Sequence, residues 1–405
     1  MKTRYGVSPW IHQFPATRRP DYPRFRGEVT TGVVIMGGGL TGCAVAQACA
    51  TAGLKVMLLE RDRIGYGSSC RSAGLLLPDP GPSFRSVVSA IGLRDARHAF
   101  ESWRRGSLDA AALLRRLKIK CQLEPQQLVV AAGRGDEKEF RREYEAREAA
   151  GLDVSWLSPK QVKAAINLDA PIGVRVRDGF SLDPYRACVG LVSAAARRGA
   201  KIFEQSAVTK VRFDRKTLDV IADDGIIHAS AVVIATGSAT AEFRPLRRHF
   251  TRREIYHVLT APVAATVRKQ LPLRDEVLKD VRVPPHRVRW TAEDRLIVAG
   301  ADQDETPAKL RSSVLVQRTG QLMYELLTMY PAISGLQPEY GWDASYGETA
   351  DGLMYIGPHR NYPRHLFALG NPADSVTGSF LSARILLRAL QGQPDKADQA
   401  FSWVR

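Results

Sequence analysis

Cysteine is scarce in this chain, and it does not occur in any pattern that forms a cross-link or a metal site. Five of the 405 residues are cysteine, at positions Cys43, Cys49, Cys70, Cys121 and Cys188. Their number is odd and no pair has CxxC spacing, so neither a disulfide framework nor a zinc site is expected. We therefore expect a reduced, cytoplasmic protein without a bound metal.

Long apolar runs are also absent. No segment approaches 18 consecutive apolar residues, so the sequence predicts no transmembrane helix. The first twenty residues have no apolar core and no small-residue cleavage site, and so they are not expected to be a secretory signal. A G-x-S-x-G sequence does not occur either, which leaves no basis for predicting a serine hydrolase.

Acidic residues are fewer than basic ones. The chain has 58 Lys and Arg against 42 Asp and Glu, a formal net charge of +16. The basic residues are scattered among acids, and no basic run alternates with aromatic residues as a base-stacking groove would. We expect a solvated basic surface and no nucleic-acid partner, while attraction to an anionic substrate or partner stays open.

The strongest motif is a glycine-rich turn between two apolar segments. Residues 33–36 are suited to a buried parallel strand, residues 37–42 read GGGLTG and match G-x-G-x-x-G, and residues 44–52 favour a helix. Residues 55–59 form a second apolar strand, with Glu60 at its end. This order predicts a dinucleotide site, because such a turn brings a pyrophosphate to the start of a helix.

Each residue of the motif has a physical role. Gly37 allows the tight turn, Gly39 lets a pyrophosphate approach the backbone, and Gly42 lets the helix pack closely on the strand. Glu60 can accept hydrogen bonds from both ribose hydroxyls, which favours an adenosine ribose without a 2′-phosphate.

Further segments follow in a defined order. A second glycine- and serine-rich loop, GSSCRSAGLL, covers residues 67–76. Later stretches at 178–211, 223–238, 289–305 and 344–359 include the hairpin turn Asp224-Gly225, a buried strand over 232–235 and the sequence GETADGLMYIG. In this order and spacing, the chain resembles the D-amino acid oxidase-like family of FAD-dependent oxidoreductases, which includes glycine oxidase, sarcosine oxidase and γ-glutamylputrescine oxidoreductase.

The resemblance implies an α/β fold with an α+β substrate part. A Rossmann-like flavin domain would be assembled from residues 29–90, 175–245 and 345–401, after an N-terminal arm over 1–28. An inserted substrate domain with an antiparallel sheet would comprise residues 91–174 and 246–344. Apolar and polar residues alternate over 256–267 and 296–301, as they would in a sheet that faces a pocket.

The resemblance also implies FAD as the cofactor and indicates which residues bind it. No cysteine follows Cys188, so the covalent attachment that some relatives make in their last third is excluded, and non-covalent FAD is expected. The expected FAD-binding residues are Gly37, Gly39, Leu40, Thr41, Gly42, Glu60, Arg61, Ser68, Ser69, Arg71, Ser72, Ala73, Gly74, Leu75, Val208, Ala235, Thr236, Gly237, Gly370, Asn371, Ser375, Val376 and Thr377.

The activity implied is oxidation of a C–N bond in a small amine or amino acid, by hydride transfer to flavin N5. No essential general base is nominated, because an amine that binds in its neutral form does not need one. Two alternatives stay open. The first is a dehydrogenase that passes its electrons to an acceptor protein instead of oxygen, and the second is a divergent flavoprotein with weak or no activity.

The substrate side departs from the family pattern. Where carboxylate-binding relatives have an arginine, this chain has Tyr346, and Arg289 or Arg360 are possible substitutes, although a structural or surface role is expected for both. Tyr256 is a further pocket candidate, whereas the adjacent His257 is expected to be a histidine with satisfied hydrogen bonds.

The last cofactor loop departs as well. Relatives have glycines where this chain has Pro372, Ala373 and Ser375, and Asn or His where it has Asp374. Proline fixes φ and removes an N–H donor, and an acid would oppose negative charge on a reduced flavin. A strand over 366–369, this altered loop and a helix over 376–390 are therefore expected to form the second half of the cradle.

Overall fold

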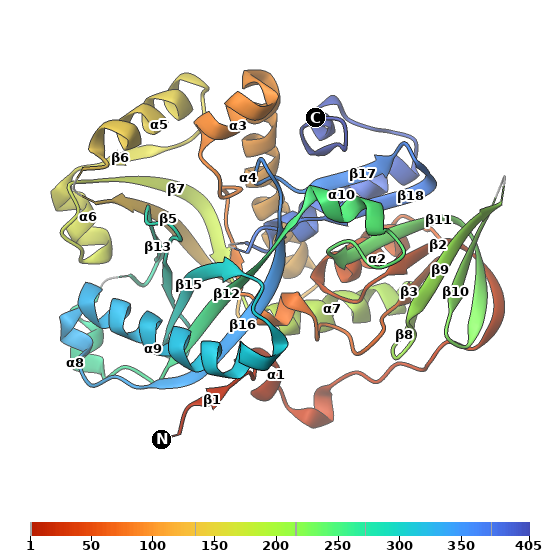
Figure 1. Ribbon diagram of the computed structural model, residues 1–405, viewed down its shortest axis with the longest axis horizontal. Coiled ribbons are helices and arrows are strands. Elements are labelled where there is room, and N and C mark those ends of the chain that lie inside the picture. Colours follow the sequence, from red (N-terminus) through yellow and green to blue (C-terminus); the bar gives the residue numbers. More distant parts are fainter. Residues whose placement is uncertain (1, 134, 215–216, 272, 374) are drawn as a thin grey trace.

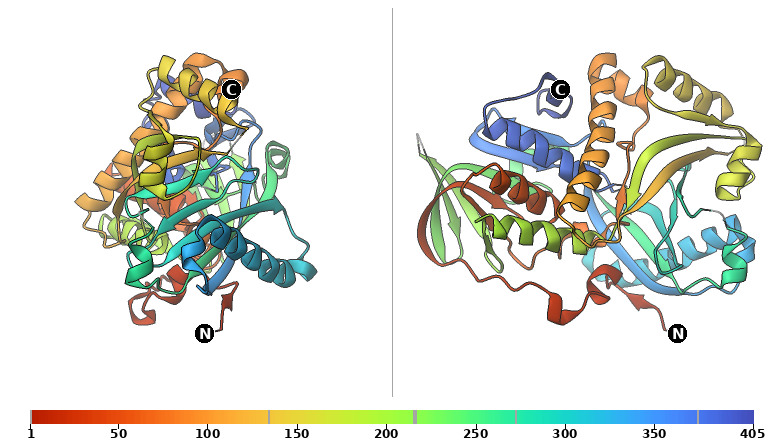
Figure 2. Two further views of the ribbon diagram at one scale, coloured as in Figure 1. Left: turned by 90° about the vertical axis from the view of Figure 1, so that its left-hand side faces the viewer. Right: turned by 180° about the vertical axis from the view of Figure 1, so that it is seen from behind.

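The computed structural model describes residues 2–133, 135–214, 217–271, 273–373 and 375–405. Two sheets lie side by side, with the strands of the larger one on the left of Figure 1 and those of the smaller one on the right. The reverse view in Figure 2 shows the same division, with the long helix α4 (Leu93–Arg116) near the junction.

The smaller sheet is built around three parallel strands. β2 (Gly27–Met36) lies between β11 (Gly225–Gly237) and β3 (Val56–Leu59), with Val34 opposite both Val232 and Met57. Within the described residues the sheet has eight strands, completed by β8 (Lys201–Phe203), β9 (Val208–Asp214), β10 (Thr217–Ala222), β17 (Tyr355–His359) and β18 (Tyr362–Leu369). The central strands are apolar along their length because both of their faces are covered.

Three helices pack together against this sheet. α2 (Leu40–Thr51) contacts both α7 (Pro184–Arg197) and α10 (Thr377–Leu390). The small alanines of α2 allow this close approach, and the buried face of α2 lies in one apolar cluster with those of α4, α7 and α10. α2 begins directly after the glycine-rich turn, so the packing of α2 fixes the position of that turn.

The larger sheet is mixed, because it contains both parallel and antiparallel strand pairs. Along its main path the strands follow the order β1–β16–β12–β15–β14–β13–β5–β7–β4, and β6 pairs with β7. The strands are β1 (Arg4–Tyr5), β4 (Leu75–Leu76), β5 (Glu124–Ala132), β6 (Ser155–Leu157), β7 (Ile172–Ser181), β12 (Thr251–Thr260), β13 (Glu276–Asp280), β14 (Arg287–Trp290), β15 (Leu296–Asp304) and β16 (Pro338–Glu348).

The two faces of the larger sheet meet different neighbours. One face packs against α9 (Arg311–Met329), with Val258 and Leu322 in a common cluster. The other face places Trp342 and Val277 in a cluster with Leu75, which belongs to the second glycine-rich loop. The second face is therefore the one that faces the smaller sheet and its loops.

The remaining helices surround these sheets. They are α1 (Pro9–His12), α3 (Phe84–Ile91), α5 (Glu137–Ala149), α6 (Pro159–Ile166) and α8 (Ala265–Arg268). In the described part of the chain, no helix is both long enough and apolar enough to cross a bilayer.

Most expected elements of the smaller sheet are present. β2, α2, β3, the turn at Asp224-Gly225 and the pair β18 and α10 confirm the predictions for these segments. The prediction of a strand over 256–267 is wrong beyond Thr260, because Pro262 lacks an N–H and the chain turns into α8. β7 crosses the predicted domain boundary between residues 174 and 175, and the domain bounds stay a prediction.

Candidate cofactor and substrate site

The glycine-rich turn is shaped by close backbone contacts. Gly37 has φ +106°, and a Cβ there would lie 2.6 Å from the carbonyl oxygen of Ala235 at the end of β11. A Cβ on Gly42 would overlap the carbonyl oxygen of Gly37. Both positions therefore need glycine, one for its conformation and both for space.

The first turn of α2 faces polar groups from two other segments. The N–H of Leu40 donates to Ser69 Oγ over 2.7 Å, and Thr41 Oγ1 lies 2.9 Å from Ser379 Oγ in α10. Gly39 is the N-cap and supplies no capping side chain. The positive end of the α2 dipole is thus directed at a loop of N–H and hydroxyl groups, an environment suited to a phosphate.

Glu60 lies where a ribose would be held. Its Oε2 accepts a hydrogen bond from the N–H of Gly38 over 2.6 Å, and burial raises the pKa of its carboxyl. The adjacent Arg61 is exposed. Val208 begins β9, two residues after Ser206, whose N–H donates to the carbonyl of Glu60 over 2.8 Å. The structure thus brings the segment before Val208 to the end of β3.

The second glycine-rich loop passes from the smaller to the larger sheet. Ser68–Arg71 form a 3-10 turn, Ser72 Oγ donates to the carbonyl of Ser69 over 2.8 Å, and Ala73 and Gly74 lead into β4 at Leu75. The side chain of Arg71 turns toward the larger sheet, where Nη1 donates to the backbone oxygen of Asp343 over 3.1 Å. Arg71 therefore joins the loop to β16.

The third segment closes over the same loops. Gly370 has φ +79°, and its N–H donates to the carbonyl of Gly237 over 3.2 Å. The N–H of Val376 donates to the carbonyl of Leu75 over 2.8 Å, and Thr377 Oγ1 donates to the carbonyl of Leu77 over 2.8 Å. The expected cofactor residues from all three segments are thus brought to one place, next to Thr236.

Two residues of this segment show how it is held. Ser375 Oγ accepts hydrogen bonds from the N–H groups of Leu77 and Thr377 over 3.0 and 3.2 Å, so its hydroxyl supports the loop. Asn371 Oδ1 is buried without a hydrogen-bond partner among the described residues. Pro372 and Ala373 are half-buried, while Asp374, the acid expected to oppose negative charge on a reduced flavin, lies outside the described residues.

The residues present fit a dinucleotide. Two glycines admit no Cβ, a helix start presents its N–H groups, a carboxylate lies at the end of the next strand, and an orphaned buried acceptor belongs to the third segment. Fold and site thus define a dinucleotide-binding α/β protein with an attached sheet that is mainly antiparallel.

Comparison with known proteins identifies the family. The model of the FAD dependent oxidoreductase family (DAO) matches residues 32–389, and the chain belongs to this family. The predictions of an FAD-dependent oxidoreductase and of FAD as its cofactor are thereby confirmed.

Two curated relatives match along most of their length. γ-Glutamylputrescine oxidoreductase of Escherichia coli K12 is 22% identical over 395 residues, which cover 95% of this chain and 89% of the relative. Glycine oxidase of Bacillus subtilis is 24% identical over 367 residues, covering 87% and 92%. The crystal structure of glycine oxidase from Geobacillus kaustophilus, with a TM-score of 0.74 at 21% identity over 93% of this chain and 99% of that one, has the same fold.

Tyr346 lies on the face of the larger sheet that meets the cofactor loop. It packs beside a cluster that includes Leu75 and Ala344, and its hydroxyl donates to Asp302 Oδ1 over 2.9 Å. Burial and the neighbouring carboxylate of Asp302 raise the pKa of the tyrosine well above its usual range. Asp302 Oδ2 in turn lies 3.4 Å from Arg287 Nη1. Sequence reasoning missed Arg287 and Asp302, although alternation along β14 places Arg287 on the same face as Arg289.

The pocket candidate Tyr256 and its neighbour His257 lie on opposite faces of the larger sheet. The side chain of Tyr256 lies on the α9 side, where its hydroxyl donates to Glu254 Oε2 over 3.0 Å. His257 lies on the cofactor side instead, because side chains alternate along a strand. It is fully buried, and neither of its ring nitrogens has a hydrogen-bond partner among the described residues, so it is not the satisfied histidine that was expected.

Arg289 and Arg360, the possible substitutes for the arginine of carboxylate-binding relatives, lie in different surroundings. Arg289 is buried and donates from Nε and Nη2 to the carbonyl of Ala73 over 2.9 and 2.6 Å. Arg360 is exposed between β17 and β18. The first therefore supports the cofactor loop, and the second lies outside the cradle.

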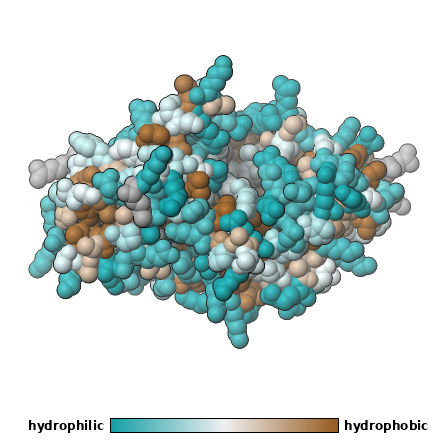
Figure 3. Space-filling view, turned by 90° about the horizontal axis from the view of Figure 1, so that it is seen from below, coloured by the Kyte–Doolittle hydropathy of each residue, from teal (hydrophilic) through white to brown (hydrophobic). Residues whose placement is uncertain are grey.

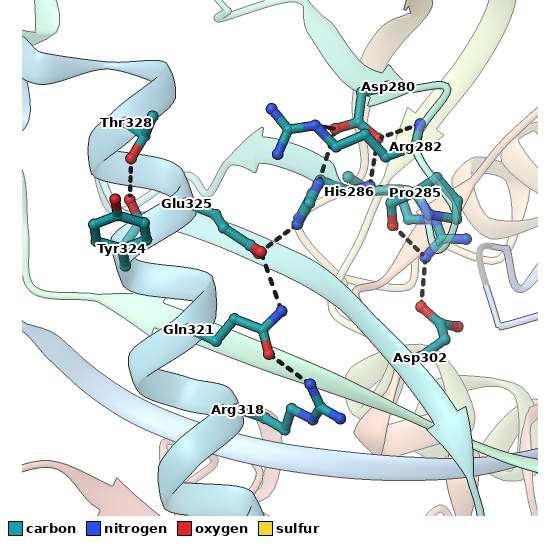
Figure 4. A network of polar contacts seen from close by, with 11 residues as sticks. Asp280, Arg282, Pro285, His286, Asp302, Arg318, Gln321, Tyr324, Glu325 and Thr328 are labelled. Atoms are coloured by element: carbon teal, nitrogen blue, oxygen red, sulfur yellow. Dashed lines mark hydrogen bonds and ion pairs between the residues drawn. The ribbon is translucent and has the colours of Figure 1, made fainter.

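A polar network covers the α9 side of the sheet (Figure 4). His286 Nδ1 lies 2.8 Å from Asp280 Oδ2, and His286 Nε2 lies 2.6 Å from Glu325 Oε2 in α9. Burial opposes protonation of His286, but the hydrogen bonds to both carboxylates outweigh it and raise the pKa. The network ties α9 to the strands that carry Arg287 and Asp302.

Proposed function

We propose that the protein oxidises the C–N bond of an amine or an amino acid. When bound, FAD supplies the acceptor for a hydride equivalent at N5. Family membership and the two relatives, an oxidoreductase of γ-glutamylputrescine and an oxidase of glycine, support the proposal. The observation that carries it is the contact between the cofactor loop at Leu75 and the sheet face that contains Tyr346.

The chain's own residues would hold FAD through backbone and side-chain groups. The N–H groups at the start of α2, from Gly39 to Thr41, would bind the pyrophosphate, and Glu60 would accept hydrogen bonds from the ribose. Ser68 to Leu75, Ala235 to Gly237 and the segment from Gly370 to Thr377 would enclose the rest. All five cysteines are reduced and buried, which agrees with non-covalent binding.

The sheet face would orient the substrate. The carboxylate of Asp302 can attract an ammonium group, and the guanidinium of Arg287 can attract a carboxylate. Trp342 and Ala344 are fully or almost fully buried on the same face and would exclude water from the reacting carbon. We propose that Tyr346 positions Asp302, because its hydroxyl donates directly to that carboxylate.

The proposal is tested with the purified protein under anaerobic conditions. Its visible flavin spectrum is recorded, and then secondary amines and amino acids are added in turn. Bleaching of the flavin by at least one of them is expected. If the protein is yellow but no amine bleaches it, amine oxidation is contradicted. The alternative of a divergent flavoprotein with weak or no activity is then favoured. Colourless protein that cannot be reconstituted would contradict FAD binding itself.

The electron acceptor is a separate question. The net charge of +16 favours an acidic carrier protein, and the face shown in Figure 3 is mainly hydrophilic, with small separate hydrophobic patches. We propose a carrier as the second candidate next to oxygen. Oxygen consumption compared with reduction of a dye, at the same substrate concentration, distinguishes them: rapid dye reduction with little oxygen uptake supports the carrier.

A further inference from the structure

A cavity outside the cofactor and substrate site opens at one end of the larger sheet. Its volume is about 640 Å³, and it lies among α1, the start of β5, the end of β7 and the turn between β14 and β15. This volume is typical of small-molecule sites. Its lining residues include none of the residues expected to bind FAD, and neither Tyr346 nor Asp302.

Arg289 lines this cavity as a buried cation. Its side chain donates to two backbone carbonyls, those of Ala73 and Trp290, and among the described residues no carboxylate lies within ion-pair distance. Burial lowers the pKa of its guanidinium to about 10. The negative charge of Asp183 acts to raise the pKa of Arg289. The carboxylate of Asp183, however, accepts its hydrogen bonds from the N–H groups of Tyr185 and Arg186. A buried charge without a counter-ion is unfavourable, and an anion in the cavity would compensate it.

The wall also contains charged residues of both signs. Asp178 and Asp294 line the cavity but pair with Arg104 and Arg268, and Glu124 and Asp275 are exposed at its rim. The rim is basic in part, because Arg177 and Arg274 are exposed there and neither has an ion pair within the described chain. Among the described lining residues, Arg289 is therefore the buried arginine that has no carboxylate partner.

The same lining residues hold the cofactor loop. Trp10 Nε1 donates to the carbonyl of Ser72 over 2.9 Å, and Arg289 binds the carbonyl of Ala73. The guanidinium of Arg289 also lies 5.7 Å from the ring centre of Trp10. A Cβ on Gly74 would lie 3.2 Å from Arg289 Nη2, so loop and guanidinium are in close contact. Whatever fixes Arg289 and Trp10 from the cavity also fixes residues 72–74.

We propose that this cavity binds a small carboxylate-bearing molecule, with its carboxylate at Arg289, and that the bound molecule stabilises the cofactor loop. The proposed ligand is defined by its carboxylate, a group that organic acids and amino acids both have. The proposal does not depend on the substrate proposed above, because Tyr346, Asp302 and Arg287 do not line this cavity.

The test uses the FAD-loaded protein, with succinate as the probe for an acid, glycine for an amino acid and succinamide as the uncharged control. Binding is measured by calorimetry, and FAD release is followed by flavin fluorescence after dilution. Saturable binding of succinate or glycine, no binding of succinamide and a several-fold slower FAD release are expected. Equal binding of succinate and succinamide, or absence of saturable binding by both charged probes at millimolar concentration, would overturn the proposal.

Two variants locate the binding. Arg289→Gln should abolish it, but this variant also loses contacts to Ala73 and risks losing the loop. Arg274→Gln removes an exposed cation of the rim that belongs to neither cofactor loop, so it should weaken binding of the anionic probes several-fold while FAD content is unchanged. Tyr346→Phe is the matched control in the substrate site. If Tyr346→Phe weakens the binding of the probe and Arg274→Gln does not, the ligand occupies the substrate site and the proposal is wrong.

Discussion

The imidazole ring of His257 lies flat against the indole ring of Trp342, with ring centres 5.1 Å apart and an angle of 10° between the planes. Trp342 Nε1 donates to the carbonyl of Arg71 over 2.9 Å, so this stack connects β12 and β16 to the cofactor loop. Burial, reinforced by the positive charge of Arg287, lowers the pKa of His257 to about 3. The ring is therefore neutral in the folded protein over most of the accessible pH range.

His257 should make the protein sensitive to acid. Below pH 6.5 the unfolded chain binds a proton at this position and the folded chain does not, so the free energy of unfolding falls as pH falls toward 3. In His257→Phe the loss between pH 7 and pH 5 should be smaller by about 2 kcal/mol. Urea unfolding of both proteins at the two pH values measures this, and equal losses would refute a neutral buried His257.

His286 should affect the pH dependence of the free energy of unfolding in the opposite direction to His257. Its raised pKa means that the folded protein binds the proton more tightly than the unfolded chain does. This contribution is fully present below the unfolded pKa and is lost as pH rises through the higher folded pKa. His286→Gln should therefore be destabilised most at acid pH, and its deficit should shrink as pH rises. Thermal denaturation across that range checks it; a deficit that grows with pH contradicts the ion-paired arrangement.

Gly42→Ala should prevent cofactor binding. The added methyl group would overlap the carbonyl of Gly37, so either the turn or the start of α2 must move. We expect a loss of at least about 2 kcal/mol in stability and little bound FAD. Flavin absorbance relative to protein absorbance measures the second effect. Gly320→Ala, in an open position of α9, is the control and should be neutral or stabilised. Full FAD content in Gly42→Ala would refute the role of the turn.

Arg405 and Asp351 form an ion pair whose loss should be costly. Arg405 Nε lies 2.6 Å from Asp351 Oδ2, and the two side chains are 3% and 11% exposed. Burial opposes ionisation of Asp351, but Arg405 outweighs it and lowers the pKa of the carboxyl. Arg405→Ala leaves a buried charge and should cost about 3 kcal/mol. The double variant with Asp351→Asn should recover part of this in urea unfolding; strictly additive losses would show that the two residues do not interact.

Tyr346→Phe should affect the substrate and leave the cofactor in place. The hydroxyl positions Asp302 and is not directed at the FAD-binding loops. With the amine that bleaches the flavin best, we expect kcat/KM to fall about tenfold, which corresponds to about 1.4 kcal/mol. Flavin content should equal that of the unchanged protein. An unchanged kcat/KM would show that the pocket lies elsewhere on the sheet.

Local patterns were sufficient for the smaller sheet and its first loop. The turn at Gly37–Gly42 and the carboxylate of Glu60 follow from spacing alone, because a strand, a tight turn and a helix are adjacent in sequence. The family resemblance supplied Gly237 and Gly370, whose contact joins positions far apart along the chain.

The substrate side was harder to predict for a physical reason. An error of one residue along β12 exchanges the two faces, and the sequence alone did not show which of the neighbours Tyr256 and His257 lies on the cofactor side. Register in β12 is set by pairing with β15 and β16, including an irregularity between Glu254 and Tyr256 that no local pattern shows. Arg287 and Asp302 come together through the pairing of β14 with β15.

The hydrogen bond from Val376 to Leu75 joins two residues that are separated by about three quarters of the chain. Such a contact cannot form on the ribosome until the last strand and helix of the smaller sheet have emerged. The FAD cradle is thus completed late in the synthesis of this protein. A nascent chain that stalls before β18 exposes an unfilled cradle and an unpaired strand edge at β11, where chaperones or proteases can act on it.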